Sequence, residues 1–264
     1  MNFGISTACF YPLETEKSLE RVNNCGCNYT ELFVNAFSEF NDEYLNRFKK
    51  IKEENSTKII SVHPFTSLLE TQFIFGDYPR RFEEGLELYK HIFSFTAELG
   101  AKISVLHGAK KEYPITCEEY TERYARLYEL AKQNGVMLAQ ECVDRCKSSS
   151  PAFLAEMRRL FPEAKFVLDL KQTRRAFTNY KEYIDAMGSN IVHLHLSDGV
   201  GCDNKKPCLP IGDGDFDFRK FFRELDEVGF KGDAILELYS NNFKTDDELI
   251  SSIKLLESLN RVES

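Results

Sequence analysis

The chain alternates eight times between a short apolar run and a longer charged segment of helical periodicity. Runs such as KIISV, KISVLH and KFVLDL are almost continuously apolar, as strands buried on both faces are. The segments between them repeat apolar residues at spacings of three and four, which is typical of amphipathic helices. This strict strand-then-helix order predicts an α/β fold built on a parallel sheet.

Periodicity, capping residues and glycine stops set the expected boundaries of the elements. The predicted strands are 2–8, 29–35, 58–63, 102–107, 136–142, 165–170, 191–196 and 233–238. The predicted helices are 15–25, 42–54, 79–99, 117–134, 151–160, 179–187, 216–228 and 246–259.

Eight strand–helix units in 264 residues predict a closed (β/α)8 barrel, a TIM barrel, forming a single domain over residues 1–264. No low-complexity linker or shift in composition divides the chain. The alternative is an open, doubly wound sheet. That fold would require a glycine-rich turn after the first strand, and the sequence ACFYPLE at that point has none.

The formal net charge is −8, from 34 basic and 42 acidic residues. An acidic protein is a poor partner for nucleic acid or an anionic membrane. No apolar run approaches the ~18 residues of a spanning helix, and the N-terminal sequence lacks the regions of a signal peptide. We therefore expect a cytoplasmic protein whose eight cysteines are reduced thiols. The sequence leaves the oligomeric state open.

Polar residues at the strand ends are the main functional signal. In a (β/α)8 barrel, functional side chains collect at the carboxyl ends of the strands. Four of the five histidines fall at such ends, and only His91 lies in the middle of a helix. The four are His63, His107, His193 and His195. Their clustering predicts a site on this rim.

Three carboxylates, Glu141, Asp169 and Glu237, lie within otherwise apolar strands. Buried carboxylates that converge would repel each other and become protonated unless a cation offsets their charge. Together with His195 they form a set of oxygen and nitrogen donors that suits one divalent metal ion: Mn²⁺, Mg²⁺, Co²⁺ or Zn²⁺. The alternative is that arginines following the fifth and sixth strands neutralise the carboxylates.

The motifs ECVDR, FVLDLKQ, HLHLSDG, LPIGDGDFDF and LELY occur in this order, and the chain resembles the xylose isomerase-like TIM barrels over essentially its whole length. That family includes sugar-phosphate isomerases and epimerases and the endonuclease-four-like enzymes. The resemblance implies that Glu141, Asp169, His195 and Glu237 bind one divalent metal. The chain departs from the family at Gln172, where a histidine is common.

The resemblance to the endonuclease-four-like enzymes is incomplete. His63 and His107 match additional zinc-binding histidines of those enzymes, but Asp203-Asn204-Lys205 has lysine where they carry a histidine. With Gln172 as a second missing nitrogen ligand and an acidic net charge, a three-zinc phosphodiester nuclease is disfavoured.

The resemblance implies isomerisation or epimerisation of a small-molecule sugar or sugar phosphate. In this chemistry the metal stabilises an enediolate while two carboxylates move protons, and Glu141 and Glu237 are the expected acid/base pair. Asp169 and His195 are then mainly ligands, with Asp198 or a backbone carbonyl orienting His195. The alternatives are a dehydratase of a polyol-like ketone on the same fold and a non-catalytic sugar-binding protein.

Substrate contacts are expected from five rim residues: His63, His107, Arg145, Gln172 and His193. All of them except Gln172 also have a structural alternative, such as holding a loop or packing inside the barrel.

Positive charge gathers after the fifth and sixth strands and would favour an anionic substrate. The residues concerned are Arg145, Lys147, Lys171, Arg174 and Arg175, of which the arginines are also the alternative partners of the carboxylates.

Two further features near the rim have simpler interpretations. Cys142 and Cys146 flank Glu141, and of the catalytic roles considered for the rim, a thiol nucleophile is the least favoured. The segment Gly212-Asp213-Gly214-Asp215 is expected to form a turn leading into a helix.

Overall fold

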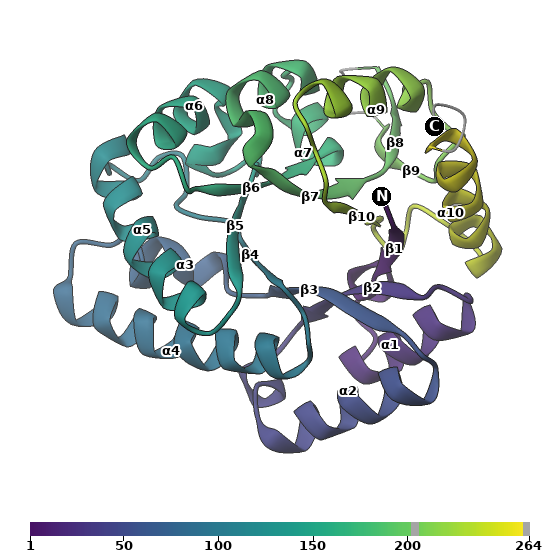
Figure 1. Cartoon of the computed structure of the whole chain (residues 1–264), viewed down its shortest axis with the longest axis horizontal. Coiled ribbons are helices and arrows are strands. Elements are labelled where there is room, and N and C mark those ends of the chain that lie inside the picture. The colour runs from purple at the N-terminus through teal and green to yellow at the C-terminus, as the bar shows by residue number, and fades with distance from the viewer. Residues whose placement is uncertain (202–205, 261–264) are drawn as a thin grey trace.

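Parallel strands form a closed ring in the computed structural model, which describes residues 1–201 and 206–260 (Figure 1). The strands of the ring are β1 (Phe3–Ser6), β2 (Tyr29–Val34), β3 (Lys58–Pro64), β4 (Ile103–Leu106), β5 (Met137–Glu141), β6 (Lys165–Asp169), β7 (Ile191–Leu196) and β10 (Asp233–Leu236). Each strand pairs with its neighbours in sequence, and β1 closes the ring by pairing with both β10 and β2. The predicted single-domain (β/α)8 barrel is confirmed, and the open sheet is excluded.

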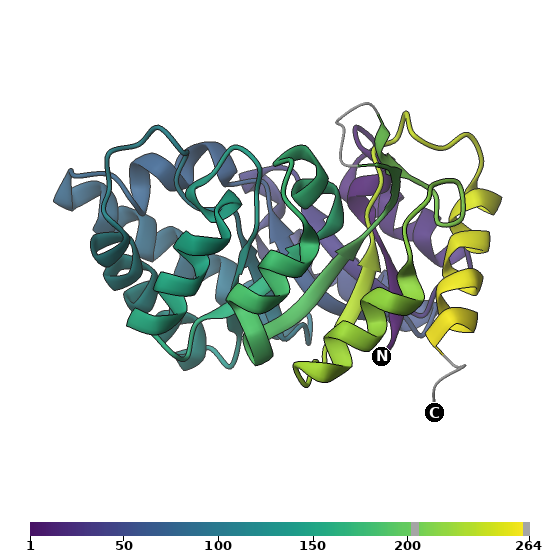
Figure 2. The ribbon, with the colours of Figure 1, turned by 90° about the horizontal axis from the view of Figure 1, so that it is seen from above.

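Helices surround the ring, and Figure 2 shows the same molecule turned by 90°. They are α1 (Thr15–Asn24), α2 (Asp42–Glu54), α3 (Ser67–Phe73), α4 (Pro79–Glu98), α5 (Cys117–Gln133), α6 (Pro151–Leu160), α7 (Leu170–Arg175), α8 (Tyr180–Met187), α9 (Phe218–Glu227) and α10 (Asp246–Asn260). Local chemistry fixes several of their starts. Thr116 and Glu119 form a capping box at α5, and the Asn41 side chain caps α2.

Two apolar layers hold the barrel together. The outer layer lies between strands and helices and includes the stacked rings of Phe75 and Tyr120, whose centroids are 3.9 Å apart. A separate cluster contains Val105, Ala139 and Val167. Ala139 and Val167 are each two residues before a predicted metal ligand on the same strand, so they face the same side of the sheet. The barrel interior therefore has an apolar middle beneath a polar end.

The structure differs from the predicted elements mainly after the carboxyl ends of the strands. Short helices α3 and α7 and an antiparallel hairpin of β8 (Asp198–Val200) with β9 (Lys206–Leu209) were not predicted, because segments this short show no periodicity. Several strands are also shorter than predicted, and β10 ends at Leu236. Glu237 nevertheless continues the pairing of β10 with β7, since its backbone N–H donates to the Leu196 carbonyl at 3.0 Å.

Some sequence predictions fall outside the described residues, namely those on Cys202 and on Asp203-Asn204-Lys205. The seven described cysteines are all free thiols. Asp217 caps α9 by accepting a hydrogen bond from the Lys220 backbone, directly after the predicted turn at 212–215.

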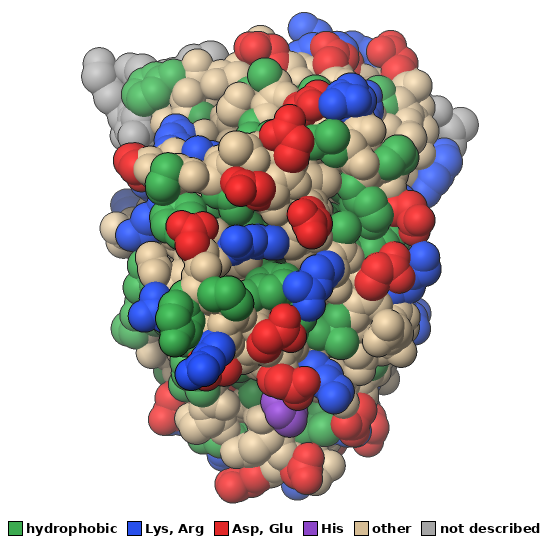
Figure 3. All heavy atoms as spheres, turned by 90° about the vertical axis from the view of Figure 1, so that its left-hand side faces the viewer, with side chains coloured by type: hydrophobic (Ala, Val, Ile, Leu, Met, Phe, Trp, Pro, Cys, Tyr) green, Lys and Arg blue, Asp and Glu red, His purple; other side chains and the backbone are tan. Residues whose placement is uncertain are grey.

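The outer surface mixes charges of both signs. Figure 3 views the left-hand side of Figure 1, where α4 and α5 lie, and shows acidic and basic side chains interspersed with small apolar areas. His91, which the sequence sets apart from the rim, is exposed on α4. Within the described ranges, no helix combines the length and apolar character needed to cross a bilayer.

Gly108, which follows β4, offers a direct test of how tightly the rim is packed. Its φ is +91°, and an added Cβ would run into the Tyr120 hydroxyl. We expect Gly108→Ala to lower the free energy of unfolding by about 2–4 kcal/mol, combining backbone strain with overpacking. Urea unfolding followed by circular dichroism measures this.

Gly135→Ala is the matched control, since Gly135 also has a positive φ (+72°) but no atom within 4 Å of an added Cβ. It should cost only about 1 kcal/mol from strain. Equal losses in the two variants would show that the contact with Tyr120 contributes nothing.

Candidate metal centre and active site

A cavity of about 260 Å³ opens at the carboxyl ends of the strands, near the small end of the range for ligand pockets. Its lining combines aromatic side chains with a concentrated set of charged and polar ones: Ala8, Tyr11, Phe33, His63, Ser67, His107, Glu141, Arg145, Lys171, Gln172, Glu237, Leu238 and Tyr239. Of the nine residues predicted from sequence to form the site, six line this cavity.

The four predicted metal ligands come together at the floor of the cavity. Each offers one ligand atom, and these atoms all lie within 4.8 Å of one another. The pairing register explains this, because Asp169 on β6 is aligned with His195 on β7. Glu141 ends β5 and Glu237 follows β10, so they reach the cluster from the two outer strands of the set β5–β6–β7–β10.

His195 Nδ1 faces the three carboxylates. It lies 3.0 Å from Glu141 Oε1, 2.9 Å from Glu237 Oε2 and 3.8 Å from Asp169 Oδ2. Two ligands on opposite sides of a cation are about 4 Å apart when each bond is about 2.1 Å. The cluster therefore already has approximately the dimensions of a divalent metal site.

Three carboxylate oxygens in this cluster have no hydrogen-bond partner among the described residues. They are Glu141 Oε2, Asp169 Oδ2 and Glu237 Oε2, and each is buried. The second oxygen of Asp169 is occupied, since Oδ1 accepts from the Gln172 backbone and caps α7. Unsatisfied buried oxygens are costly, so this donor set fits a divalent cation.

Glu31 lies directly behind His195, on the side away from the other carboxylates. Its Oε2 is 3.1 Å from His195 Nε2, 3.2 Å from His193 Nε2 and 2.8 Å from Ser61 Oγ. Because a carboxylate can only accept, Nε2 of His195 carries a proton and donates it to Glu31. This leaves Nδ1 as the atom available to a metal, the arrangement expected of a histidine ligand backed by a carboxylate.

The partner of His195 is thus Glu31 on β2, a residue to which the sequence analysis assigns no role. Asp198, which was predicted to orient His195 with a backbone carbonyl as the alternative, instead accepts hydrogen bonds from the backbone N–H groups of Gly199, Gly212 and Phe216. It stabilises the turn after β9. An acidic residue in the second strand was the available signal, but sequence alone does not show toward which strand it points.

Electrostatics favour ionised carboxylates around a positive centre. Burial opposes ionisation of Glu31, Glu141 and Glu237, but neighbouring histidines and Lys171 outweigh it. They lower the pKa of Glu141 to about 2 and hold the pKa values of the other two well below the usual range. Burial would lower the pKa of His195, yet Glu31 and Glu237 raise it well above its ordinary value. A proton on Nδ1 and a metal ion would thus compete for the same place.

Lys171 is the cation that contacts this cluster directly. Its Nζ lies 2.5 Å from Glu237 Oε1 and 3.4 Å from Asp169 Oδ2, and 4.9 Å from the centre of the Tyr239 ring. Lys171 is almost fully buried. Lys171 donates a hydrogen bond to Glu237 Oε1, while Asp169 Oδ2 and Glu237 Oε2 accept none from it, so one lysine restrains the cluster without replacing a divalent cation.

The arginines proposed as alternative partners point elsewhere. Arg174 donates to the backbone carbonyls of Ser197 and Asp198, and Arg175 pairs with Asp144 at 3.0 Å. Lys171 is buried against the cluster, and Arg145 is the exposed cation at the cavity. The preference for an anionic substrate stays a prediction.

His63 and His107 form a pair on the other side of Glu141. Their Nε2 atoms are 2.9 Å apart, and they lie 3.9 and 3.7 Å from Glu141 Oε2, respectively. Glu70 stands behind His107, with Oε1 3.5 Å from His107 Nδ1. His63, His107 and Glu141 therefore make a second group of possible metal ligands beside the first.

Arg145 and Gln172 line the cavity, as expected of residues that contact substrate. Arg145 is exposed, and its guanidinium donates to Ser67 Oγ at 3.2 Å. Gln172 Oε1 accepts from the Asp144 backbone, which orients the side chain across the loops after β5 and β6.

His193 is the predicted substrate contact that the structure places elsewhere. It points to the same side of β7 as His195, but two residues along a strand amount to about 6.6 Å in depth. The side chain is fully buried below the cluster and lines a different cavity. Its position is set by Glu31 and Ser61, which hold Nε2.

A family model described as xylose isomerase-like TIM barrel matches residues 19–259. The chain belongs to the xylose isomerase-like TIM barrel family.

Relatives and solved structures agree with this assignment. An uncharacterised protein of Mycobacterium bovis is 27% identical over 268 residues, covering 93% of this chain and 91% of the relative. D-psicose 3-epimerase from Clostridium cellulolyticum H10, solved with D-tagatose, superposes with a TM-score of 0.79 at 16% identity, covering 98% and 99% of the two chains. The IolI protein, solved with a zinc atom, gives 0.77 at 20% identity, covering 97% and 96%. These structures share the fold.

The thiols next to the cluster can be tested for reactivity. Burial raises the pKa of Cys146 to about 12 and that of Cys142 well above its usual value, so neither is a thiolate at neutral pH. In alkylation by iodoacetamide followed by mass spectrometry, we expect Cys117, which is partly exposed, to react first among the seven described cysteines. Rapid labelling of Cys142 or Cys146 in the folded protein would contradict this prediction and would support a thiol nucleophile.

The role of Glu31 predicts a change in metal affinity. Glu31→Gln removes the charge that holds the proton on His195 Nε2, and divalent metal should bind about 10- to 100-fold more weakly by isothermal titration calorimetry. Glu16→Gln is the control, since Glu16 is also buried but pairs with Arg47 on the helical shell. Unchanged affinity in Glu31→Gln would show that this carboxylate does not support the site.

Proposed function

We propose that the protein is a divalent-metal-dependent isomerase or epimerase of a small sugar or sugar phosphate. The observation that carries the proposal is the convergence of Glu141, Asp169 and Glu237 on His195 Nδ1 at the floor of a small polar cavity, with one buried oxygen of each carboxylate left without a hydrogen-bond partner among the described residues. The epimerase activity of a protein with the same fold is consistent with it. We further propose that residues 1–264 act as one catalytic domain.

The proposed cofactor is a single Mn²⁺, Mg²⁺, Co²⁺ or Zn²⁺ ion held by Glu141, Asp169, His195 and Glu237. Bound there, the ion would polarise a substrate carbonyl and stabilise the negative charge that develops on its oxygen. Asp169 and His195 are ligands that the fold fixes from behind, through the cap of α7 and through Glu31.

The reaction itself requires a base and an acid on either side of a carbon next to a carbonyl. Glu141 and Glu237 approach from opposite ends of the four-strand set, and both are ionised at neutral pH, as a base requires. One removes the C–H proton to give an enediolate, and the other, after it takes a proton from solvent, delivers that proton to the opposite face or to the neighbouring carbon, while the first returns its proton to solvent. The first outcome is epimerisation and the second is isomerisation.

Other residues would position the substrate. Lys171 holds one oxygen of Glu237, which leaves the second oxygen directed at the cluster. His63, His107 and Gln172 offer hydrogen-bonding groups to hydroxyls, and Arg145 can reach a phosphate or hydroxyl at the cavity mouth.

Glu237→Gln tests the proposal most directly. The wild type should contain about one divalent metal per chain by elemental analysis and should exchange a C–H next to a carbonyl with deuterium from solvent, followed by NMR on a panel of ketoses, aldoses and their phosphates. The variant should lose the metal and slow the exchange by about 10²- to 10⁴-fold. Glu122→Gln, on the exposed face of α5, is the control.

Three other results would contradict the proposal in different ways. A product formed from the substrate by loss of one water molecule would identify a dehydratase. Two or three zinc ions per chain, with His63 and His107 as added ligands, would favour a phosphodiester nuclease. Metal-free protein that exchanges nothing but binds sugars would indicate a binding protein.

A further inference from the structure

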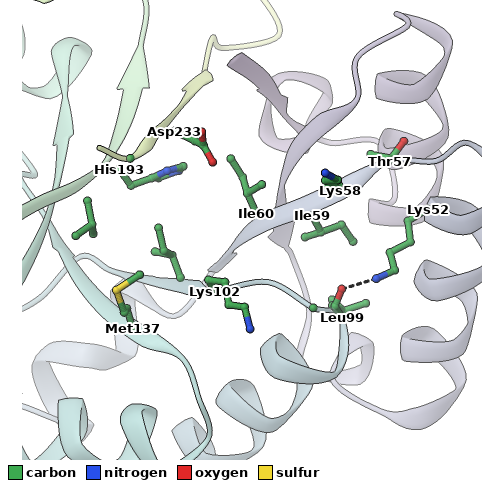
Figure 4. A pocket seen from close by; sticks show the side chains of 14 residues that line it. Lys52, Thr57, Lys58, Ile59, Ile60, Leu99, Lys102, Met137, His193 and Asp233 are labelled. Atoms are coloured by element: carbon green, nitrogen blue, oxygen red, sulfur yellow. Dashed lines mark hydrogen bonds between the residues drawn. The ribbon is translucent and has the colours of Figure 1, made fainter. Parts of the chain in front are cut away.

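A second cavity, of about 350 Å³, opens at the opposite mouth of the barrel (Figure 4). It lies among the amino ends of the strands, between the starts of β3, β4, β5, β7 and β10. Its lining as described contains none of the four candidate metal ligands. The proposed reaction leaves this cavity without a role, although its volume falls within the range of small-molecule sites.

The charge at this mouth is opposite to that of the whole chain. Lys52, Lys58 and Lys102 line the cavity against one acid, Asp233, although the protein carries a net charge of −8. Asp233 is already engaged by the backbone and side chain of Asn2, and Lys52 donates to the Leu99 carbonyl at 2.6 Å (Figure 4). Lys58 and Lys102 form no ion pair with any carboxylate in the described part of the chain. The mouth thus offers two lysines to an anion.

His193 contributes a buried hydrogen-bonding atom to the same cavity. Its side chain is fully buried, and in Figure 4 the ring extends from β7 toward Ile60. Nε2 lies against the Glu31 carboxylate and therefore carries the proton, which makes Nδ1 an acceptor. Nδ1 has no donor among the described residues. A ligand that donates one hydrogen bond would satisfy it.

The remaining walls are apolar. Ile60, Ile103, Met137 and Val192 line the cavity together with the lysines and His193. A bare inorganic anion would leave these walls and the His193 acceptor unused. A ligand with a short carbon skeleton would cover both.

We propose that this mouth is a second binding site, for a small hydroxylated organic anion such as a polyol phosphate or a hydroxy acid. Its phosphate or carboxylate contacts Lys58 and Lys102, its carbon chain lies on the apolar walls, and one hydroxyl donates to His193 Nδ1. The site is separate from the proposed reaction and does not depend on it.

Met137 provides a local probe, since it alone of the chain's four methionines lines this cavity, whereas Met157 and Met187 are buried elsewhere. Glycerol 3-phosphate and 3-phosphoglycerate are titrated into metal-loaded, full-length protein labelled with ¹³C at the methionine methyl groups. We expect a saturable shift of the Met137 signal, assigned with Met137→Leu, while Met157 and Met187 stay unchanged. Binding at the carboxyl-end cavity alone would leave Met137 unmoved.

Lys58→Gln combined with Lys102→Gln should weaken the Met137 titration by at least about tenfold, since two attractive charges are lost. Both lysines are exposed, so folding should be unaffected, and Lys254→Gln on the outer face of α10 is the matched control. No shift with either ligand at about 10 mM, or a shift that survives loss of both lysines, would overturn the proposal. So would an equal response to inorganic phosphate or to glycerol, because each lacks one half of the proposed ligand.

Discussion

Negative charge buried inside the barrel is the constraint on which the rest of this structure depends. Glu31, Glu141, Asp169 and Glu237 are all largely or fully enclosed, with Lys171 as the lysine beside them. Such an interior is unstable unless each carboxylate has donors or a cation. The histidines of β3 and β7, the cap of α7 and Ser61 supply part of this need. One oxygen each of Glu141, Asp169 and Glu237 is left without a hydrogen-bond partner among the described residues.

The fold and the four converging residues were predictable because both follow from periodic features of the sequence. Alternating apolar runs specify the barrel, and the barrel in turn brings strand-end residues such as Asp169 and His195 together, whatever their distance along the chain. The roles around them were not predictable. Whether Lys171 turns inward to Glu237 or outward to solvent depends on a six-residue helix, and this is too short to leave a periodic pattern.

His193 illustrates a second limit. The alternation of side chains along a strand correctly predicts that His193 points into the barrel. It does not show whether the side chain lies at the cavity or below it. The barrel interior changes from polar to apolar within about one pair of residues, and His193 lies on the far side of Glu31. Its assignment therefore needed the position of a residue from β2, which is remote in sequence.

The two mouths of the barrel are thus chemically different although they share one interior. Buried carboxylates converge beneath the cavity at the carboxyl end, and three lysines line the cavity at the amino end. Neither the overall charge of −8 nor the mixed surface in Figure 3 reveals this difference between the two ends of the barrel axis.

One carboxylate joins the two mouths, because Glu31 Oε2 is within 3.2 Å of Nε2 of both His193 and His195. Substitutions at these three positions will therefore be epistatic, since each changes the partner of the other two. A replacement that suits one mouth must also be acceptable at the other. A substitution of Glu31 would therefore call for a compensating substitution of His193 or His195, so the two ends of the barrel cannot change independently at this position.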